Sequence, residues 1–272
     1  MPAMRRLSLS NAASPAAISP SLGPLLVLSL VLTACGAPTA KVMPFIGSIG
    51  LDGDLSIAES TGTGRTSSSF DDLGITDDEA SLGGIVRIGM GGAELSLAGL
   101  SVDYEGSGTT RGEFSLDGQS IGADVAVDTD VELQMARGLF TWDLIPIGGV
   151  DLGFGVGATL VDLQFDLREQ SGTAGVNTDQ LIPIPLIGAR AAWKWGPVDL
   201  RADLGGLVVE YDGDEATVID GEVSAAVEFL GVGDLVVGYR LTRIDALYED
   251  EDSSVDADFD LEGYYFGLQF GF

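Results

Sequence analysis

The stretch Gly263-Tyr-Tyr-Phe-Gly-Leu-Gln-Phe-Gly-Phe272 at the C-terminus decides the fold class of this chain. In an extended strand, successive side chains point to opposite faces. One face is then apolar and consists of Tyr264, Phe266, Leu268, Phe270 and Phe272. The other face is small or polar and consists of Gly263, Tyr265, Gly267, Gln269 and Gly271. A strand that separates lipid from a polar interior has this pattern.

The same alternation, with a period of two residues, dominates the chain from Val42 to Phe272. About ten such segments are present, which predicts an all-β protein: a closed, antiparallel, up-and-down transmembrane β-barrel of about ten strands, with eight or twelve as alternatives. The apolar residues change phase between Leu97 and Leu100, and again between Val156 and Val161. We interpret such a phase change as a β-bulge within a strand.

The expected connections alternate in length. Those after odd-numbered strands are long and acidic, around residues 59–79, 105–120, 168–180, 211–217 and 248–256. Those after even-numbered strands are short, around 91–92, 146–149, 195–197 and 231–234. Outer-membrane barrels have long extracellular loops and short periplasmic turns. An even number of strands then places both termini in the periplasm.

The final strand also resembles the C-terminal assembly signal of bacterial outer-membrane β-barrels, in which an alternating apolar strand ends on Phe. The resemblance covers residues 42–272 as architecture, and it implies a small barrel of a kind that often has no assigned function. It implies a location in the bacterial outer membrane. It also implies outer-membrane lipids and the barrel-assembly machinery as partners. In this chain the signal would consist of Tyr264, Phe266, Leu268, Phe270 and Phe272.

The N-terminus has the features of an export signal. Arg5 and Arg6 precede a short apolar run, Leu25–Leu32, which is too short to span a membrane as a helix. Leu32-Thr33-Ala34-Cys35 resembles the lipobox of bacterial lipoproteins, which implies cleavage before Cys35 and acylation of its thiol. The alternative is an ordinary signal peptide. We expect a signal peptide at 1–34, a periplasmic tether at 35–41 and the barrel at 42–272.

The chain has a net charge of −29 and a pI near 4.1. Nucleic acid is therefore excluded as a partner, because phosphate binding needs clustered Lys and Arg. Acidic clusters in the expected loops raise the question of divalent cations, with Asp250 and Asp252 as weak Ca²⁺ candidates. No cluster has the spacing of an established calcium loop, so we predict solvated surface charge and no metal site.

Charged residues on the polar face of the strands form a predicted ladder inside the barrel. Buried charges need partners or water, so a stabilising ladder of ion pairs is the first interpretation. The alternative is a narrow, cation-favouring pore. The predicted ladder consists of Arg87, Glu94, Glu132, Asp162, Arg190, Asp199, Arg201, Asp203, Glu222, Glu228 and Arg240.

The chain contains no histidine, which removes the usual general base of hydrolases and the commonest metal ligand. We therefore expect no catalysis and no cofactor. The predicted role is structural, or one of surface interaction through acidic extracellular loops. Two alternatives remain: the narrow pore or small-solute conduit, and a surface-tethered, lipocalin-like lipid-binding barrel with its apolar face inward.

Overall fold

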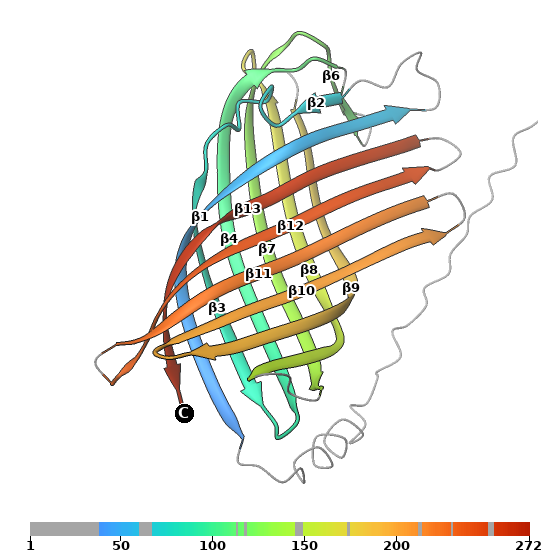
Figure 1. Ribbon diagram of the computed structural model, residues 1–272. Coiled ribbons are helices and arrows are strands. Elements are labelled where there is room, and N and C mark those ends of the chain that lie inside the picture. Colours follow the sequence, from blue (N-terminus) through green and yellow to red (C-terminus); the bar gives the residue numbers. More distant parts are fainter. Residues whose placement is uncertain are drawn as a thin grey trace, which may run out of the picture. The chain divides into compact units, whose positions relative to one another are not determined.

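Ten long strands form one closed antiparallel barrel in the computed structural model (Figure 1). The structure describes residues 38–59, 67–112, 114–116, 119–144, 149–172, 175–211, 214–229, 231–249 and 253–272. In this part of the chain, no helix is long and apolar enough to cross a membrane. The barrel strands are β1 (Thr39–Glu59), β3 (Glu79–Gly89), β4 (Ala93–Thr109), β7 (Ala126–Asp143), β8 (Val150–Glu169), β9 (Gly175–Trp195), β10 (Val198–Tyr211), β11 (Asp214–Phe229), β12 (Gly233–Glu249) and β13 (Ser253–Gly271).

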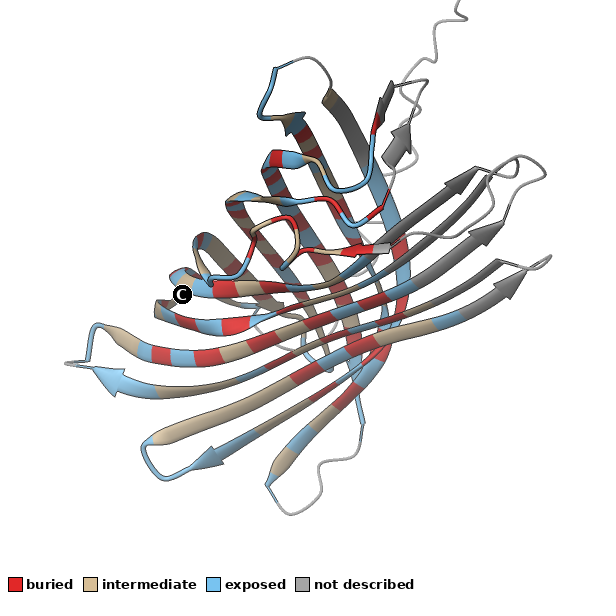
Figure 2. Cartoon of the chain, turned by 90° about the horizontal axis from the view of Figure 1, so that it is seen from above, coloured by how far each residue is buried: buried red, intermediate tan, exposed pale blue. Residues whose placement is uncertain are grey.

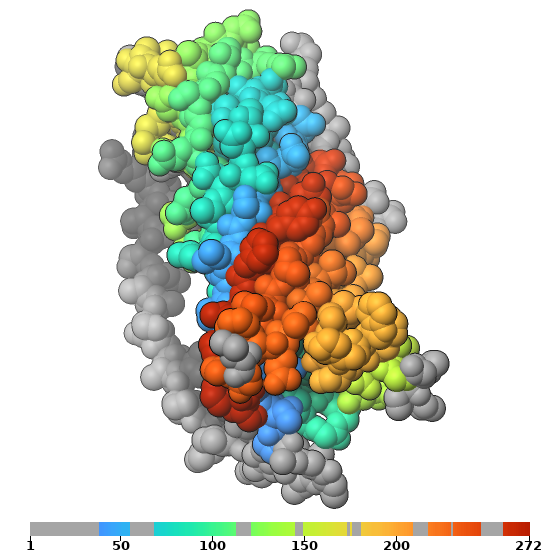
Figure 3. Space-filling model, turned by 60° about the vertical axis from the view of Figure 1, so that its left-hand side comes forward, coloured from blue at the N-terminus to red at the C-terminus, as the bar shows by residue number. Residues whose placement is uncertain are grey.

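The barrel closes where β1 pairs with β13, so that the first and last strands lie side by side (Figure 3). This closure confirms the predicted all-β barrel of ten strands. Three short strands lie outside the ring order: β2 (Ser67–Ser69), β5 (Phe114–Leu116) and β6 (Gln119–Ile121). β2 and β6 lie at the end of the barrel opposite the C-terminus (Figure 1). We call the half that carries the C-terminus the lower half, and the other the upper half.

The strands are strongly staggered around the ring. A series of paired residues that starts at Ala40 passes through all ten strands and returns to β1 at Asp52, twelve residues further along. With the usual rise per residue and strand spacing, this stagger tilts the strands by about 40° from the barrel axis. Such a tilt is usual for barrels that cross a membrane.

The two phase changes in the sequence are not bulges. The pairing of β4 with β3 and β7 continues without a break through Leu97 and Leu100. The pairing of β8 with β7 and β9 likewise continues from Val156 to Val161. The bulge interpretation is therefore wrong. The backbone keeps its parity, and the apolar residues move from the outer face to the inner face of the same strand.

The outer surface is divided by one boundary in polarity. Below it, outward side chains are apolar and form a belt, which on β13 extends from Tyr264 to Phe272. Nine residues at about 3.3 Å each, tilted by about 40°, give an apolar band about 23 Å tall, close to the roughly 25 Å that outer-membrane barrels present to lipid. The uppermost apolar residues of the belt include Ile46, Leu97, Ala136, Leu160, Leu241 and Tyr264. Above them, the outward residues are polar or charged and include Ser48, Asp103, Glu132, Asp162, Arg243 and Glu262.

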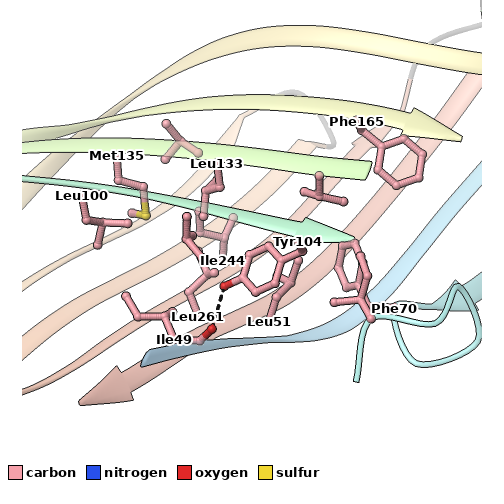
Figure 4. Packing of buried hydrophobic residues seen from close by; sticks show 14 of the residues in the cluster. Ile49, Leu51, Phe70, Leu100, Tyr104, Leu133, Met135, Phe165, Ile244 and Leu261 are labelled. Carbon is pink, nitrogen blue, oxygen red and sulfur yellow. Dashed lines mark hydrogen bonds between the residues drawn. The ribbon is translucent and has the colours of Figure 1, made fainter. Parts of the chain in front are cut away.

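The interior shows the reverse order of polarity. In the upper half the inward residues form an apolar core, in which Tyr104 donates a hydrogen bond from its hydroxyl to the carbonyl of Ile49 (3.1 Å; Figure 4). In the lower half the inward residues include charged side chains that are almost fully buried, such as Arg137 and Asp220. Buried and exposed residues alternate along the strands throughout (Figure 2). The strand parity is thus constant while the polarity of both faces inverts at the boundary.

Part of the connection between β2 and β3 is folded inward and closes the upper end. Phe70, Leu73 and Ile75 are buried in the apolar core. The backbone N–H of Thr109 donates a hydrogen bond to the carbonyl of Asp72 (2.8 Å), and the Thr129 hydroxyl donates one to the carbonyl of Leu73 (3.1 Å). This segment was predicted as an extracellular loop, but its apolar residues make it a plug.

Three of the five predicted long loops are instead largely strand. β8 ends at Glu169 and β9 begins at Gly175, so most of 168–180 is paired backbone. β10 and β11 are separated only by residues 212 and 213, and β12 and β13 only by residues 250–252. Their polar residues have the composition of loops because these parts of the strands lie above the apolar belt. The asymmetry of long and short connections therefore holds only for the β1–β3 and β4–β7 connections.

Candidate functional site: a chain of buried ion pairs

Five arginines and five carboxylates form a chain of ion pairs inside the lower half of the barrel, and cations alternate with anions along it. At its upper end, Arg240 on β12 lies 3.3 Å from Asp220 on β11. Asp220 also pairs with Arg137 of β7 at 2.9 Å. Arg137 reaches Glu222 of β11 at 3.0 Å, and Glu222 binds Arg87 of β3 at 2.9 Å. These side chains are almost completely shielded from solvent.

The chain continues from Arg87 toward the lower mouth of the barrel. Arg87 lies 4.0 Å from Asp203, which Arg201 binds with two donors, at 2.6 and 2.8 Å. Arg201 also donates to Glu94 of β4 at 2.5 Å. Glu94 lies 3.9 Å from Arg190 on β9, which forms the last ion pair with Asp143. Because each charge touches an opposite charge, the network is electrically balanced within the barrel.

The strand register brings these residues together. Asp220 and Glu222 are successive inward positions on β11, and Glu222 is directly opposite Asp203 on β10 and Arg240 on β12. Arg87 and Arg137 reach this cluster from β3 and β7, which are not neighbours of β11. Long arginine side chains therefore connect opposite walls of the ring.

Neutral side chains complete the hydrogen bonding of the network. The Tyr265 hydroxyl donates to Glu222 at 3.0 Å, and the Thr159 hydroxyl donates to Asp220 at 3.2 Å. The side-chain oxygen of Gln269 accepts from Arg87 at 3.2 Å. Tyr265 can reach Glu222 because its ring lies over Gly238, its cross-strand neighbour. A Cβ atom at Gly238 would lie only 2.2 Å from the Tyr265 ring.

Most of the predicted ladder points into the barrel, but part of it does not. The interior holds Arg87, Glu94, Arg190, Asp199, Arg201, Asp203, Glu222 and Arg240. Glu132 and Asp162 are corrections, because they lie on the outward face of β7 and β8 above the boundary. Glu228 keeps the inward parity of Glu222 on β11 but is exposed at the lower mouth of the barrel.

The sequence prediction missed Arg137, Asp220 and Asp143. Asp130 and Glu132, which precede Arg137 on β7, lie on the other face of the strand. If these acidic residues are assigned to the interior, Arg137 is assigned to the outside and is missed. The signal was available: Val127, Val131 and Leu133 share the parity of Arg137, and all four are buried. The inward face of β7 can be assigned correctly only if the polarity of both faces is known to invert at the boundary.

The other predicted site residues have separate positions. Cys35, with the rest of the lipobox, lies outside the described residues, as do Asp250 and Asp252. In the described ranges, no group of three or more acidic or thiol side chains is arranged to hold a metal ion. β1 begins at Thr39, so residues 39–41 of the predicted tether belong to the barrel. The terminal strand points Tyr264, Phe266, Leu268 and Phe272 outward and exposed.

Solved structures share this architecture. The outer membrane protease OmpT from Escherichia coli is similar with a TM-score of 0.58 and 11% sequence identity, over 86% of this chain and 97% of that chain. The chain has the fold of a bacterial outer-membrane β-barrel. Further barrels of this type that match are the translocator domain of the autotransporter NalP from Neisseria meningitidis (TM-score 0.44, 15% identity, 91% of this chain and 93% of that chain) and Ail from Yersinia pestis (TM-score 0.27, 9% identity, 85% and 99%).

At these identities the outer-membrane barrel fold is all that the likeness establishes. No protein-family model matches the chain. No curated protein sequence matches it either.

Proposed function

We propose that this protein is an integral barrel of the bacterial outer membrane with a sealed interior, and that it serves a structural or surface-interaction role. The observation that carries the proposal is the polarity boundary. Below it the barrel presents apolar side chains to its surroundings, and above it the same strands present charged ones. This surface suits a protein whose lower half lies in hydrocarbon and whose upper half stands in water.

A transport role receives less support from the interior. A pore needs a continuous wet passage, but the plug with Phe70, Leu73 and Ile75 and the apolar core below it occupy the upper half. Beneath the core, the ion-pair chain crosses the lower half from Arg240 to Asp143. Reconstitution in planar lipid bilayers tests this point, and we expect no stepwise conductance in concentrated KCl. Regular conductance steps would favour the narrow-pore alternative.

A soluble, lipocalin-like barrel would have apolar side chains inside and polar ones outside over its whole length. The described strands have that arrangement only above the boundary. Extraction by detergent alone, with a heat-dependent shift of migration in gels of unboiled samples, supports the membrane barrel. Release of a water-soluble monomer without detergent would overturn it.

Catalysis is not part of this proposal. The similar structure OmpT is described as a protease, but this chain has no histidine. Among the described residues, the buried carboxylates Asp203, Asp220 and Glu222 are each paired with arginines of the ion-pair chain. We further propose that both termini are periplasmic, that Cys35 carries acyl chains and that the terminal strand guides assembly. Mass spectrometry of the mature N-terminus tests the second point, because an unmodified thiol removes the anchor.

A further inference from the structure

A polar cavity of about 270 Å³ opens at the lower mouth of the barrel, beneath the ion-pair chain. Its size is close to the lower end of small-molecule sites in proteins, about 300 Å³. Arg87, Arg190 and Gln269 contribute to its lining, and each is more than nine-tenths buried. Lys41 and Lys194 also contribute, and both are exposed to solvent. The cavity therefore has buried donors in its lining and exposed cationic side chains near its opening.

The lining of this cavity is much richer in cations than the chain as a whole. The chain has 13 Lys and Arg residues against 42 Asp and Glu. Five of those 13 cations line this cavity, whereas only three carboxylates do, namely Glu94, Asp151 and Asp199. The chain has only two lysines, Lys41 and Lys194, and both are here. Arg87, Arg190 and Arg201 are balanced by carboxylates of the ion-pair chain, so Lys41 and Lys194 carry the positive charge that an anion meets at the opening.

The hydrogen-bonding groups of the lining leave a donor free. Among the described residues, the Nε of Arg87 is buried and has no hydrogen-bond partner, although both terminal nitrogens of that side chain are paired. Lys41 has no ion pair in the described part of the chain. Lys194 lies 3.4 Å from Asp199, whose buried Oδ1 also lacks a hydrogen bond. A buried donor without an acceptor is costly, so an acceptor from a ligand would stabilise this site.

We propose that the lower mouth binds a small molecule through a phosphate group. Guanidinium and ammonium donors on several sides of one cavity suit phosphate oxygens, which accept many charge-assisted hydrogen bonds. The phosphate group enters from the end that carries the C-terminus and the start of β1. Lys41 and Lys194 attract it at the opening, and Arg87 and Arg190 donate to it, whereas Arg201 is held by Asp203 and Glu94. Free phosphate and a phospholipid headgroup offer the same chemistry.

Titration calorimetry on the full protein in detergent micelles, with inorganic phosphate as the probe and NaCl at equal ionic strength as reference, tests the site. We expect binding by the wild type and at least a tenfold weaker affinity in the double variant Lys41→Gln/Lys194→Gln. The matched control is Arg168→Gln/Arg243→Gln, which changes the net charge equally but alters exposed cations of the upper half. This control should bind phosphate as the wild type does.

Two results overturn the proposal: no phosphate binding beyond the chloride reference, or an equal loss in the two double variants. Heat-dependent gel migration verifies that each variant is folded. A second arm adds lysophosphatidylglycerol or lysophosphatidylcholine to the micelles. Competition by the anionic lipid alone identifies a lipid headgroup as the source of the phosphate, and absence of competition identifies a free phosphate compound.

Discussion

Arg137 on β7 and Asp220 on β11 form an ion pair across the barrel, with Nη1 and Oδ1 2.9 Å apart and both side chains at most 1% exposed. Asp220 also accepts from Arg240 and Thr159. Two charges so far from water are retained only if each has a partner, since a lone buried charge costs several kcal/mol. This pair therefore fixes the contact between opposite walls of the ring.

Replacement of Asp220 by Asn removes the only ion pair that the described residues provide for Arg240. We expect Asp220→Asn to lower the free energy of unfolding by about 3–5 kcal/mol. A second change, Arg240→Met, removes the orphaned charge and should recover part of this loss. Urea unfolding in micelles measures both effects.

The control for this prediction is Asp130→Asn, whose ion pair with Arg168 is 3.5 Å long and exposed. Exposed pairs contribute at most about 1 kcal/mol, so this variant should unfold almost as the wild type does. Equal losses for Asp130→Asn and Asp220→Asn would contradict the role given to the buried chain.

The boundary in polarity predicts opposite outcomes for one substitution at two outward positions of β8. Val156 lies in the apolar belt and is 54% exposed, whereas Gln164 lies above the boundary. Val156→Arg should cost about 2–4 kcal/mol in lipid, because arginine near the middle of a bilayer loses its hydration. Gln164→Arg should cost almost nothing. Folding into lipid vesicles, followed by gel migration, compares the two, and equal yields would argue against the boundary.

Gly238 supports the ion-pair chain indirectly through Tyr265. In Gly238→Ala the new methyl group collides with the Tyr265 ring, which must move and loses its hydrogen bond to Glu222. We expect a loss of about 1–3 kcal/mol in unfolding free energy, as for other overpacked sites. Gly221→Ala is the control, because its nearest contact would be an ordinary 3.6 Å from the Leu204 side chain. A neutral Gly238→Ala would show that the ring has room to shift.

The outer wall above the boundary contains directly opposed carboxylates. Asp258 on β13 pairs in register with Asp54 on β1 and Asp245 on β12. Partial burial and the charges of Asp245 and Asp260 raise the pKa of Asp258 above its usual range. A carboxyl whose pKa is higher in the folded state binds more protons there, so stability falls as the pH rises through that pKa.

Asp258→Asn should therefore stabilise the protein at neutral pH by a few tenths of a kcal/mol, the size of one like-charge cross-strand contact near the surface. The gain should vanish at a pH below about 3, where aspartate is protonated in both the folded and the unfolded protein. Urea midpoints of wild type and variant across this pH range measure the difference. A gain that persists in acid would point to packing rather than charge.

The period-two pattern by itself determined the barrel. Given the alternation from Val42 to Phe272, few folds other than a closed barrel satisfy the backbone hydrogen bonds of ten strands in a membrane. The sequence also predicted that Tyr264 and Phe266 share an apolar face. Alternation separates two faces of a strand, however, without saying which of them is inside.

Only the tertiary structure decided that the inner face is charged below the boundary and apolar above it. Closure and register fix which residues of neighbouring strands lie at the same height along the barrel axis. At one such height the polarity of both faces of β4, β7 and β8 inverts. In one dimension this inversion is indistinguishable from a bulge. For that reason alternation alone assigns Glu132 to the inside and overlooks Arg137. The plug at Phe70–Ile75 has a different cause, because no local pattern shows that a polar connection folds back into the barrel.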